Sequence, residues 1–401
     1  MFVLDNPARH KAPIKVWLEG PEHLETVCLN QAINLANIPF LHQWVALMPD
    51  THQGYGMPIG GVAALREVVI PNAVGVDIGC GICFAETDLP REALTPETGR
   101  RLIARIMERI PVGFKHQETP QTAPAVEAYL AENRARLKGH GQLYRELEGV
   151  FYQLGTLGGG NHFIELQADD GGRICLMVHS GSRNIGLKIA NYFNEKAKLI
   201  SKKSGWQTHV RNQLAFMPAD SESGRAYLEW METALLFAAE NRRLMMEALR
   251  DILQAEFPTV NFLREVNVHH NYAALETHYG EAVWVHRKGA IRAGAGEIGI
   301  IPGAMGAASY LVEGLGNPES FCSCSHGAGR HISRKQALKE IRREKVFEDL
   351  ERLGVQVGTP DRDGLVDESR FVYKDIHTVM NDQRDLVRIL KTLQSVLVVK
   401  G

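Results

Sequence analysis

The sequence predicts an α+β fold, a single large domain spanning residues 1–401 in which mixed sheets are flanked by helices. Strand-like and helical segments follow one another in a mixed order, without the strict alternation of a doubly wound sheet. No repeat of 20 to 50 residues and no low-complexity linker divides the chain. The chain has 38 glycines, and most of its 16 histidines lie in glycine-rich stretches, which places the candidate chemistry on glycine-rich loops.

The first 90 residues are predicted to be rich in strands. Short apolar and β-branched runs are separated there by Pro, Gly, Asn and Asp, the residues typical of turns. The expected strands cover 44–48, 60–65, 68–71 and 74–87.

Helical patterns dominate the middle of the chain. Thr95 is a suitable N-cap, Pro96 suits the first helical position, and Ile103, Ile106 and Ile110 recur at helical spacing. These features predict a helix over 96–110. Further helices are expected over 124–138, 186–203 and 224–256, with a strand over 174–178.

The last third of the chain returns to short strands separated by glycines. These strands are expected over 263–268, 282–285, 290–292 and 309–312. Helices are predicted over 334–349 and 376–392, and a closing strand over 396–399.

Composition excludes several classes of protein. Charged residues make up 23% and hydrophobic residues 44% of the chain, as in ordinary globular proteins and unlike disordered ones. Lys and Arg number 45 against 47 Asp and Glu, which excludes a polybasic binder. No apolar run is long enough for a membrane helix, and the first eleven residues lack a signal-peptide pattern. The sequence therefore predicts a cytoplasmic protein that does not enter a membrane.

The densest chemical signal lies in residues 72–83. Asp77 and Cys80 offer an oxygen and a sulfur ligand three residues apart on a glycine-rich turn, where one cation can take both. Cys80 and Cys83 also resemble half of a zinc knuckle, but the other half would need the irregular pair Cys322 and Cys324.

Three further stretches place histidines beside glycine or amide residues, at 158–165, 179–183 and 267–272. Strand ends and glycine turns allow such loops to converge. One Asp, one Cys and three His of this kind would complete a two-metal site with the thiolate as a bridge, and paired metals suit phosphoryl and nucleotidyl transfer.

A fifth stretch, 321–330, combines His326 with an anion-binding pattern. Gly327 and Gly329 permit close backbone approach, while Arg330 and Arg334 are expected on one face of a starting helix. Phosphate is expected to bind there. Residue type alone leaves His326 open as an acid or base, a ligand or a covalent nucleophile.

Three other patterns carry less weight. The stretch 294–299 matches GxGxxG but leads into Ile300, Ile301 and Pro302 rather than a helix. No P-loop pattern exists, so a P-loop ATPase or GTPase is not supported. The basic stretch 334–345 is compatible either with a solvated helix face or with contact to a polyanion.

Taken together, seven ordered blocks closely resemble the RtcB family of RNA-splicing ligases. The resemblance runs from about residue 12 to residue 401. The blocks lie at 48–54, 76–81, 160–163, 179–183, 286–290, 301–303 and 325–330.

The resemblance implies a GTP- and manganese-dependent ligase with two Mn²⁺ ions at its active site. Such an enzyme joins an RNA 2′,3′-cyclic phosphate or 3′-phosphate end to a 5′-hydroxyl end, in RNA splicing or repair. It implies that His326 carries GMP and that Asp50 orients the His326 imidazole. An activating protein is possible but is not required by the sequence.

The resemblance also assigns binding residues. The metal ligands are expected to be Asp77, Cys80, His162, His179 and His270. Guanylate contacts are expected from Asn161, Phe163, Glu165, Ser309, Arg330, Tyr373 and Lys400. Phosphates, including those of RNA, are expected to be held by Arg183, Lys288, Arg330 and Arg334. The chain departs from the family pattern at Ala304, where a serine is usual, so one guanylate contact is expected to be missing.

Two other functions fit parts of the pattern. A two-metal phosphoesterase acting on RNA or nucleotide ends would use Asp77, Cys80 and the histidines without GTP. The third alternative is a non-catalytic RNA-binding or chaperone-like module. Such a module has no need for the whole set of candidate metal ligands and His326, so their joint presence argues against it.

Overall fold

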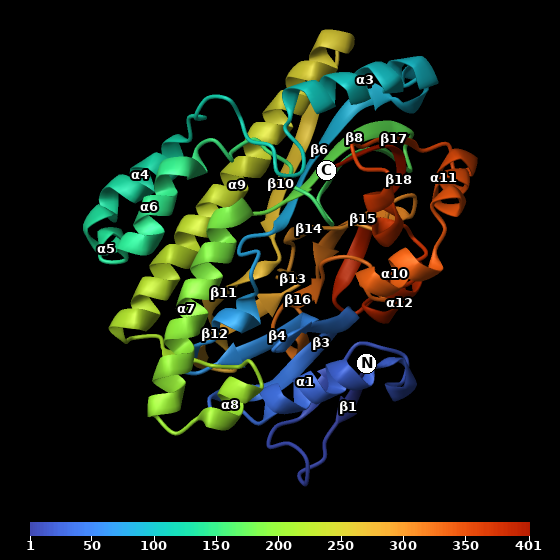
Figure 1. The fold of residues 1–401 in the computed structure, drawn as a ribbon. Helices are drawn as coiled ribbons and strands as arrows, with labels where there is room; N and C mark the ends of the chain where they lie inside the picture. Colours follow the sequence, from blue (N-terminus) through green and yellow to red (C-terminus); the bar gives the residue numbers. More distant parts are fainter.

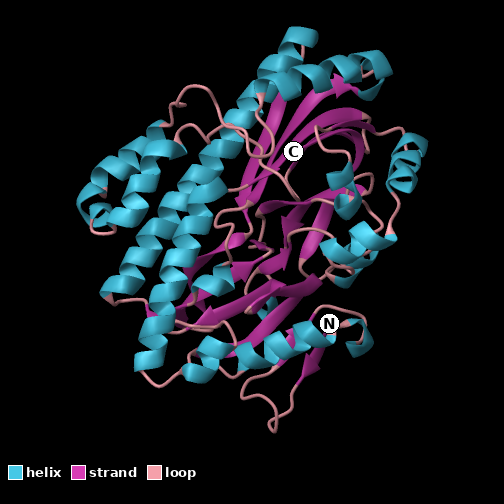
Figure 2. Ribbon diagram, viewed as in Figure 1, coloured by secondary structure: helices cyan, strands magenta, loops and turns pink.

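Two large sheets organise the computed structural model, which describes residues 1–401 (Figures 1 and 2). The strands are β1 (Phe2–Leu4), β2 (Ile14–Val16), β3 (Leu41–Tyr55), β4 (Met57–Leu65), β5 (Val68–Val69), β6 (Gly81–Pro90), β7 (Phe163–Asp169), β8 (Arg173–Ser180), β9 (Met217–Pro218), β10 (Phe262–His269), β11 (Asn271–His278), β12 (Glu281–Lys288), β13 (Ala290–Arg292), β14 (Ile298–Ile301), β15 (Ala308–Gly314), β16 (Ser323–Ser325), β17 (Gln356–Gly358) and β18 (Val387–Lys400). The helices are α1 (Thr26–Ala36), α2 (Pro71–Val74), α3 (Pro96–Arg109), α4 (Pro124–Glu132), α5 (Arg134–Lys138), α6 (Gly141–Val150), α7 (Arg183–Lys203), α8 (Gln207–Arg211), α9 (Glu222–Glu256), α10 (Arg334–Glu340), α11 (Arg343–Arg352) and α12 (Ile376–Asp382). Four short 3₁₀ segments, η1 (Pro21–His23), η2 (Arg91–Ala93), η3 (Pro318–Ser320) and η4 (Asp363–Glu368), complete the elements.

The first sheet has six strands in the order β1-β2-β3-β4-β12-β11. The second runs β10-β6-β8-β7-β18-β15-β14, with β17 paired to β18. The chain passes from one sheet to the other at His270, between β10 and β11. The space between the sheets is therefore lined by strand ends and connecting loops, which is where polar side chains can converge.

Helices α7 and α9 pack against each other along one side of the molecule (Figure 1). Helix α9 begins at the N-cap Ser221, whose side chain accepts a hydrogen bond from the Gly224 N–H. Its buried Tyr227, Trp230 and Phe237 pack in a core shared with α7. Farther along the helix, the buried residues within 245–249 pack against β6 and β8, so α9 covers one face of the second sheet.

Strand β18 occupies an interior position of the second sheet. It pairs antiparallel with β7 on one side and with β15 on the other. Its last residue, Lys400, is paired with Phe163, the first residue of β7, so the end of β18 and the start of β7 lie at the same end of the sheet.

The structure confirms the mixed α+β architecture and most predicted elements, including the helices within 96–110 and 224–256 and the strand over 290–292. Other boundaries were wrong. The predicted strand 74–87 is the end of α2, a loop, and then β6. The predicted helices 124–138 and 334–349 are each broken into two, and 376–392 is helical only to Asp382. Helices α1 and α6 were not predicted.

No helix in the chain combines the length and the apolar character that crossing a bilayer requires.

Candidate active site

Strand pairing brings the distant histidine motifs together. The β6–β8 register places Gly81 opposite Ser180, and the β7–β8 register places Phe163 opposite His179. On the other edge of β6, Gly81 lies opposite His269. Cys80 precedes Gly81, His162 precedes Phe163, and His270 follows His269. These three residues therefore lie at the same end of the sheet, as the sequence predicted.

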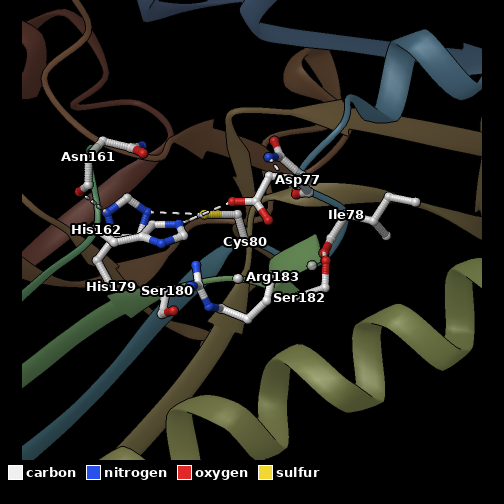
Figure 3. A network of polar contacts seen from close by, with 12 residues as sticks. Asp77, Ile78, Cys80, Asn161, His162, His179, Ser180, Ser182 and Arg183 are labelled. Atoms are coloured by element: carbon white, nitrogen blue, oxygen red, sulfur yellow. Dashed lines mark hydrogen bonds and ion pairs between the residues drawn. The ribbon is translucent and has the colours of Figure 1, made fainter. Parts of the chain in front are cut away.

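Cys80 lies at the centre of this cluster. Its Sγ is 3.3 Å from Nε2 of His179 and 3.6 Å from Nε2 of His162 (Figure 3). The His162 Nε2 is also 3.1 Å from an Asp77 carboxylate oxygen. Two ligand groups result, one of Asp77, Cys80 and His162 and one of Cys80, His179 and His270, with the ligand atoms of each within 4.8 Å of one another. Cys80 belongs to both groups, as a bridging thiolate would.

The neighbouring backbone fixes the orientation of two imidazoles. The Nδ1 of His162 is 3.0 Å from the Leu157 carbonyl oxygen, and the Nδ1 of His179 is 3.0 Å from that of Asn161. Each ring donates through Nδ1, which leaves the Nε2 lone pair directed at Cys80. The His270 Nδ1 is buried and has no hydrogen-bond partner. A buried ring nitrogen without a partner and a mixed S, N and O donor set both fit divalent transition metals.

Burial sets the protonation of these ligands. It lowers the pKa of His179 and of His270 well below the usual value, and neighbouring histidines lower them further. Both rings are therefore neutral and able to bind a metal. Burial, followed by the Asp77 carboxylate, raises the pKa of the Cys80 thiol well above its usual value. Ionisation of this thiol needs the compensating charge of a cation.

Helix α9 supports the loop that carries Cys80 through Arg242, a residue that the sequence did not predict to be part of the site. Its buried guanidinium donates to the carbonyl oxygens of Gly79 and Ser180, at 2.8 and 2.9 Å. It also donates to the Asn267 side chain at 2.8 Å. Arg242 thus ties together the three segments that carry the cysteine and two of the histidines. A single arginine in a long helix carries no sequence signal for this role.

His326 follows β16 and lies against Asp50 of β3. Its Nδ1 is 2.7 Å from Asp50 Oδ2, and the same oxygen accepts the backbone N–H groups of His326 and Gly327 at 3.1 and 3.3 Å. Asp50 is fully buried. The carboxylate therefore fixes the proton on Nδ1, which leaves Nε2 of the neutral ring as a free nucleophile.

The ligand cluster around Cys80 and the His326–Asp50 pair form one site. The rings of His326 and His270 are in edge contact, with centroids 4.7 Å apart. A pocket of about 330 Å³ opens beside them, lined from the first sheet by His52 and Ile59 and from the second by Phe163 and His179. Its wall includes seven of the residues predicted for guanylate or phosphate contact, namely Asn161, Phe163, Glu165, Arg330, Arg334, Tyr373 and Lys400.

Three predicted binding residues do not line this pocket. Ser309 is buried behind it, where its hydroxyl accepts from Gln167 and from the Gly303 N–H. Arg183 lies beside Asp77 and Cys80 (Figure 3). Its guanidinium donates to the Thr156 hydroxyl and to the Gly113 carbonyl. Lys288 is buried, and its ammonium donates to the carbonyl oxygens of Tyr55 and Asn72.

The basic wall of the pocket is organised by Glu368, a second residue missed at the sequence level. Its carboxylate accepts from Arg330 and Tyr373 at 2.6 Å each, pairs with Arg334 at 3.0 Å and lies 3.6 Å from Lys400. The prediction of a helix carrying both arginines was wrong, because α10 begins at Arg334 and Arg330 instead bridges to Tyr373. The two guanidinium groups converge through the shared carboxylate.

A buried carboxylate also faces the pocket from β7. Burial raises the pKa of Glu165 to about 7, against the opposing effect of hydrogen bonds from Gln167 and Ser395. Ala304 lines the same pocket, and its methyl group offers no hydrogen bond. The pocket wall therefore lacks the serine hydroxyl that is usual in the family at position 304.

The four-cysteine alternative is wrong in this structure. Cys83 Sγ donates to Glu265 at 3.7 Å, and Cys324 Sγ lies 3.5 Å from the Ser325 carbonyl. Neither belongs to a potential metal-binding group. The GxGxxG-like stretch leads into β14, a strand, as its weak context indicated.

The chain is similar to known proteins over nearly its whole length. A family model described as "tRNA-splicing ligase RtcB" matches residues 31–401. The RNA-splicing ligase RtcB of Escherichia coli K12 is 41% identical over 405 aligned positions, covering 97% of this chain and 98% of that protein. A relative of the same name from Mycobacterium tuberculosis is 33% identical and covers 92% of this chain, and the tRNA-splicing ligase RtcB of Pyrobaculum aerophilum is 31% identical over 92%. From the family match and these relatives, we conclude that this chain belongs to the RtcB family of tRNA-splicing ligases.

Proposed function

We propose that this protein joins RNA ends that carry a 2′,3′-cyclic phosphate or a 3′-phosphate to ends that carry a 5′-hydroxyl, with GTP as the source of activation. The observation that carries the proposal is the His326–Asp50 pair, which lies against a ligand cluster with Cys80 at its centre. A nucleophilic imidazole beside a two-metal ligand set is the arrangement that nucleotidyl transfer requires.

In the first step, Nε2 of His326 attacks the α-phosphorus of GTP. A P–N bond forms, the P–O bond to pyrophosphate breaks, and pyrophosphate leaves. Asp50 holds the Nδ1 proton and balances the positive charge that develops on the ring. The carboxylate need not accept this proton, because the ring returns to neutral when GMP leaves.

In the following steps, an oxygen of the RNA 3′-phosphate attacks the phosphorus of the histidine-bound GMP and the P–N bond breaks. The 5′-hydroxyl then attacks the 3′-phosphorus, a phosphodiester forms, and GMP leaves. A cyclic end must first take up one water molecule and open to a 3′-phosphate. We assign guanylate binding to Asn161, Phe163, Glu165, Tyr373 and Lys400 of the pocket wall, and phosphate binding to Arg330 and Arg334 of the same wall. Arg183, which lies outside the wall beside Asp77 and Cys80, is also assigned to phosphate binding.

Two Mn²⁺ ions, held by Asp77, Cys80, His162, His179 and His270, would neutralise charge on the attacking and leaving oxygens. The fit rests on the buried unpartnered Nδ1 of His270 and on the donor set. Such donors also bind zinc tightly.

The test is covalent labelling. Wild-type protein incubated with GTP labelled at the α-phosphate and with manganese, or with zinc in parallel, should acquire an acid-labile, alkali-stable adduct. His326→Ala should abolish the adduct, and Cys80→Ala should reduce it. Wild-type protein that never acquires label would refute the proposal. The two-metal phosphoesterase instead predicts phosphate release without GTP, lost in Cys80→Ala and retained in His326→Ala.

A further inference from the structure

Asp50 lies at an irregular point of β3. The β3–β4 register pairs Leu47 with Gly61 and then His52 with Ile59, with a shift between the two pairs. Gly60 lies opposite this interruption with φ of +79°, and a Cβ on it would come within 2.9 Å of both Asp50 Oδ1 and Thr51 Cα. A bulge of this kind redirects a side chain, and here the redirected side chain is the carboxylate that contacts His326.

Lys374 supplies donors to the two peptide carbonyls that flank Asp50. Its ammonium is 3.0 Å from the Pro49 oxygen and 2.6 Å from the Thr51 oxygen. Neither Pro49 nor Thr51 has a partner in the β4 register. Each hydrogen bond from a charged donor stabilises this conformation more than a neutral one would. Lys374 thus supplies the backbone carbonyls of the bulge with the donors that β4 supplies at the paired residues of β3.

The backbone of Lys374 is attached to the turn that carries His326. Its N–H donates to the Gly329 carbonyl at 2.8 Å. Gly329 has φ of +73°, and a Cβ there would lie 2.1 Å from the Asp50 carbonyl oxygen, so the turn and the bulge are in direct backbone contact. Lys374 therefore bridges the two segments whose side chains form the 2.7 Å contact between Asp50 and His326.

We propose that Lys374 is a positioning residue for the nucleophile, which holds Asp50 on Nδ1 of His326 and so aims Nε2 at the α-phosphorus. This inference rests on the proposed function, because it assigns a role in GMP transfer to His326. Lys374 does not line the pocket and so does not contact the nucleotide. The Asp50 carboxylate also acts electrostatically on Lys374, partly opposing the lowering of the Lys374 pKa by burial, so the two charges stabilise each other.

The test separates the rate of labelling from nucleotide binding. In Lys374→Met, the single-turnover rate of GMP transfer to His326 should fall about 100-fold, since small misplacements of reacting groups cost this much. The Kd for GTP should stay within about twofold, because the pocket wall is unchanged. Lys374→Arg keeps the charge and several donors, and should recover most of the rate.

A bypass substrate distinguishes positioning from general damage. An RNA whose 3′-phosphate already carries GMP needs no attack by His326, so Lys374→Met should join it to a 5′-hydroxyl strand at the wild-type rate. Lys391→Met is the matched control, since Lys391 is a partly buried lysine paired with Asp169 and Glu86 away from the pocket. It should leave both rates unchanged.

The outcomes are separable. Equal losses with GTP and with the bypass RNA, or unchanged labelling in Lys374→Met, would overturn the inference while leaving the proposed function intact. Wild-type protein that acquires no GMP would instead overturn the proposed function. If Lys374→Met fails to fold, Lys374→Gln keeps amide donors of similar reach without the charge, and the same split between labelling and bypass ligation is expected.

Discussion

Replacing Asp50 with asparagine tests how the buried carboxylate assists His326. The amide is nearly the same size, and two backbone N–H groups, those of His326 and Gly327, point at the Oδ2 position. These donors favour the amide oxygen at that position, where it still accepts the His326 Nδ1 proton. Asp50→Asn should therefore keep the imidazole in the tautomer that leaves Nε2 free.

The expected loss of rate in Asp50→Asn comes only from removing the negative charge of the carboxylate. Two unit charges about 4 Å apart at an effective dielectric of about 20 interact by about 4 kcal/mol. With roughly half a positive charge on the ring in the transition state, the carboxylate contributes about 2 kcal/mol, which corresponds to roughly a 30-fold rate. The two backbone hydrogen bonds are present before and after the reaction, so weakening them lowers the free energy of unfolding rather than the rate.

The assay is the single-turnover rate of GMP transfer to His326 at saturating GTP, compared with Asp88→Asn at the far end of β6 as control. A fall of about 10⁴-fold, as seen when a serine-protease triad loses the correct histidine tautomer, would mean that the amide rotates and the tautomer changes. A fall of less than about threefold would show that the Asp50 charge is not used in the reaction.

Three further changes have defined outcomes. Cys80→Ala should weaken binding of both metal equivalents by at least about 10²-fold in calorimetry, because the sulfur belongs to both ligand groups. Burial raises the pKa of Glu165 from 4.5 to about 7, so protein stability should fall as pH rises from about 4.5 to about 7 and level off above that, since the unfolded chain loses this proton first. GTP affinity should increase as pH rises through about 7, because the ionised carboxylate is the better acceptor for guanine N–H groups. Glu165→Gln should remove both trends in binding and denaturation measurements. Ala304→Ser should tighten GTP binding by about 1 kcal/mol, measured as the Kd, if the added hydroxyl makes one neutral hydrogen bond.

The sequence predicted that the candidate metal ligands lie together, because they occur in short motifs and the family resemblance groups them. Asp77 and Cys80 share one glycine-rich turn, and His162 and His179 each adjoin a strand end, so local spacing and a family resemblance were sufficient. Arg242, Glu368 and the Lys374 contacts were not predictable in this way. Each is a charged residue without a motif, and its partners lie far along the chain.

Two of the wrongly predicted elements show where periodicity alone fails. Residues 376–392 carry apolar side chains at spacings that fit a helix, yet Val387–Lys400 is a strand, because β15 offers backbone partners to residues 387–394 and β7 to residues 393–400. The helix predicted over 124–138 is interrupted at Asn133, where φ of −96° and ψ of 9° depart from helical values although the N–H still donates to the Tyr129 carbonyl.

The interior position of β18 has a consequence for the order of assembly. Until residues 387–400 emerge from the ribosome, β7 and β15 have no neighbour to join them, and the second sheet stays in two pieces. The same late segment brings Lys400 to the pocket wall. Ligands of this pocket are therefore expected to bind only those chains in which residues 387–400 have already joined the two parts of the second sheet.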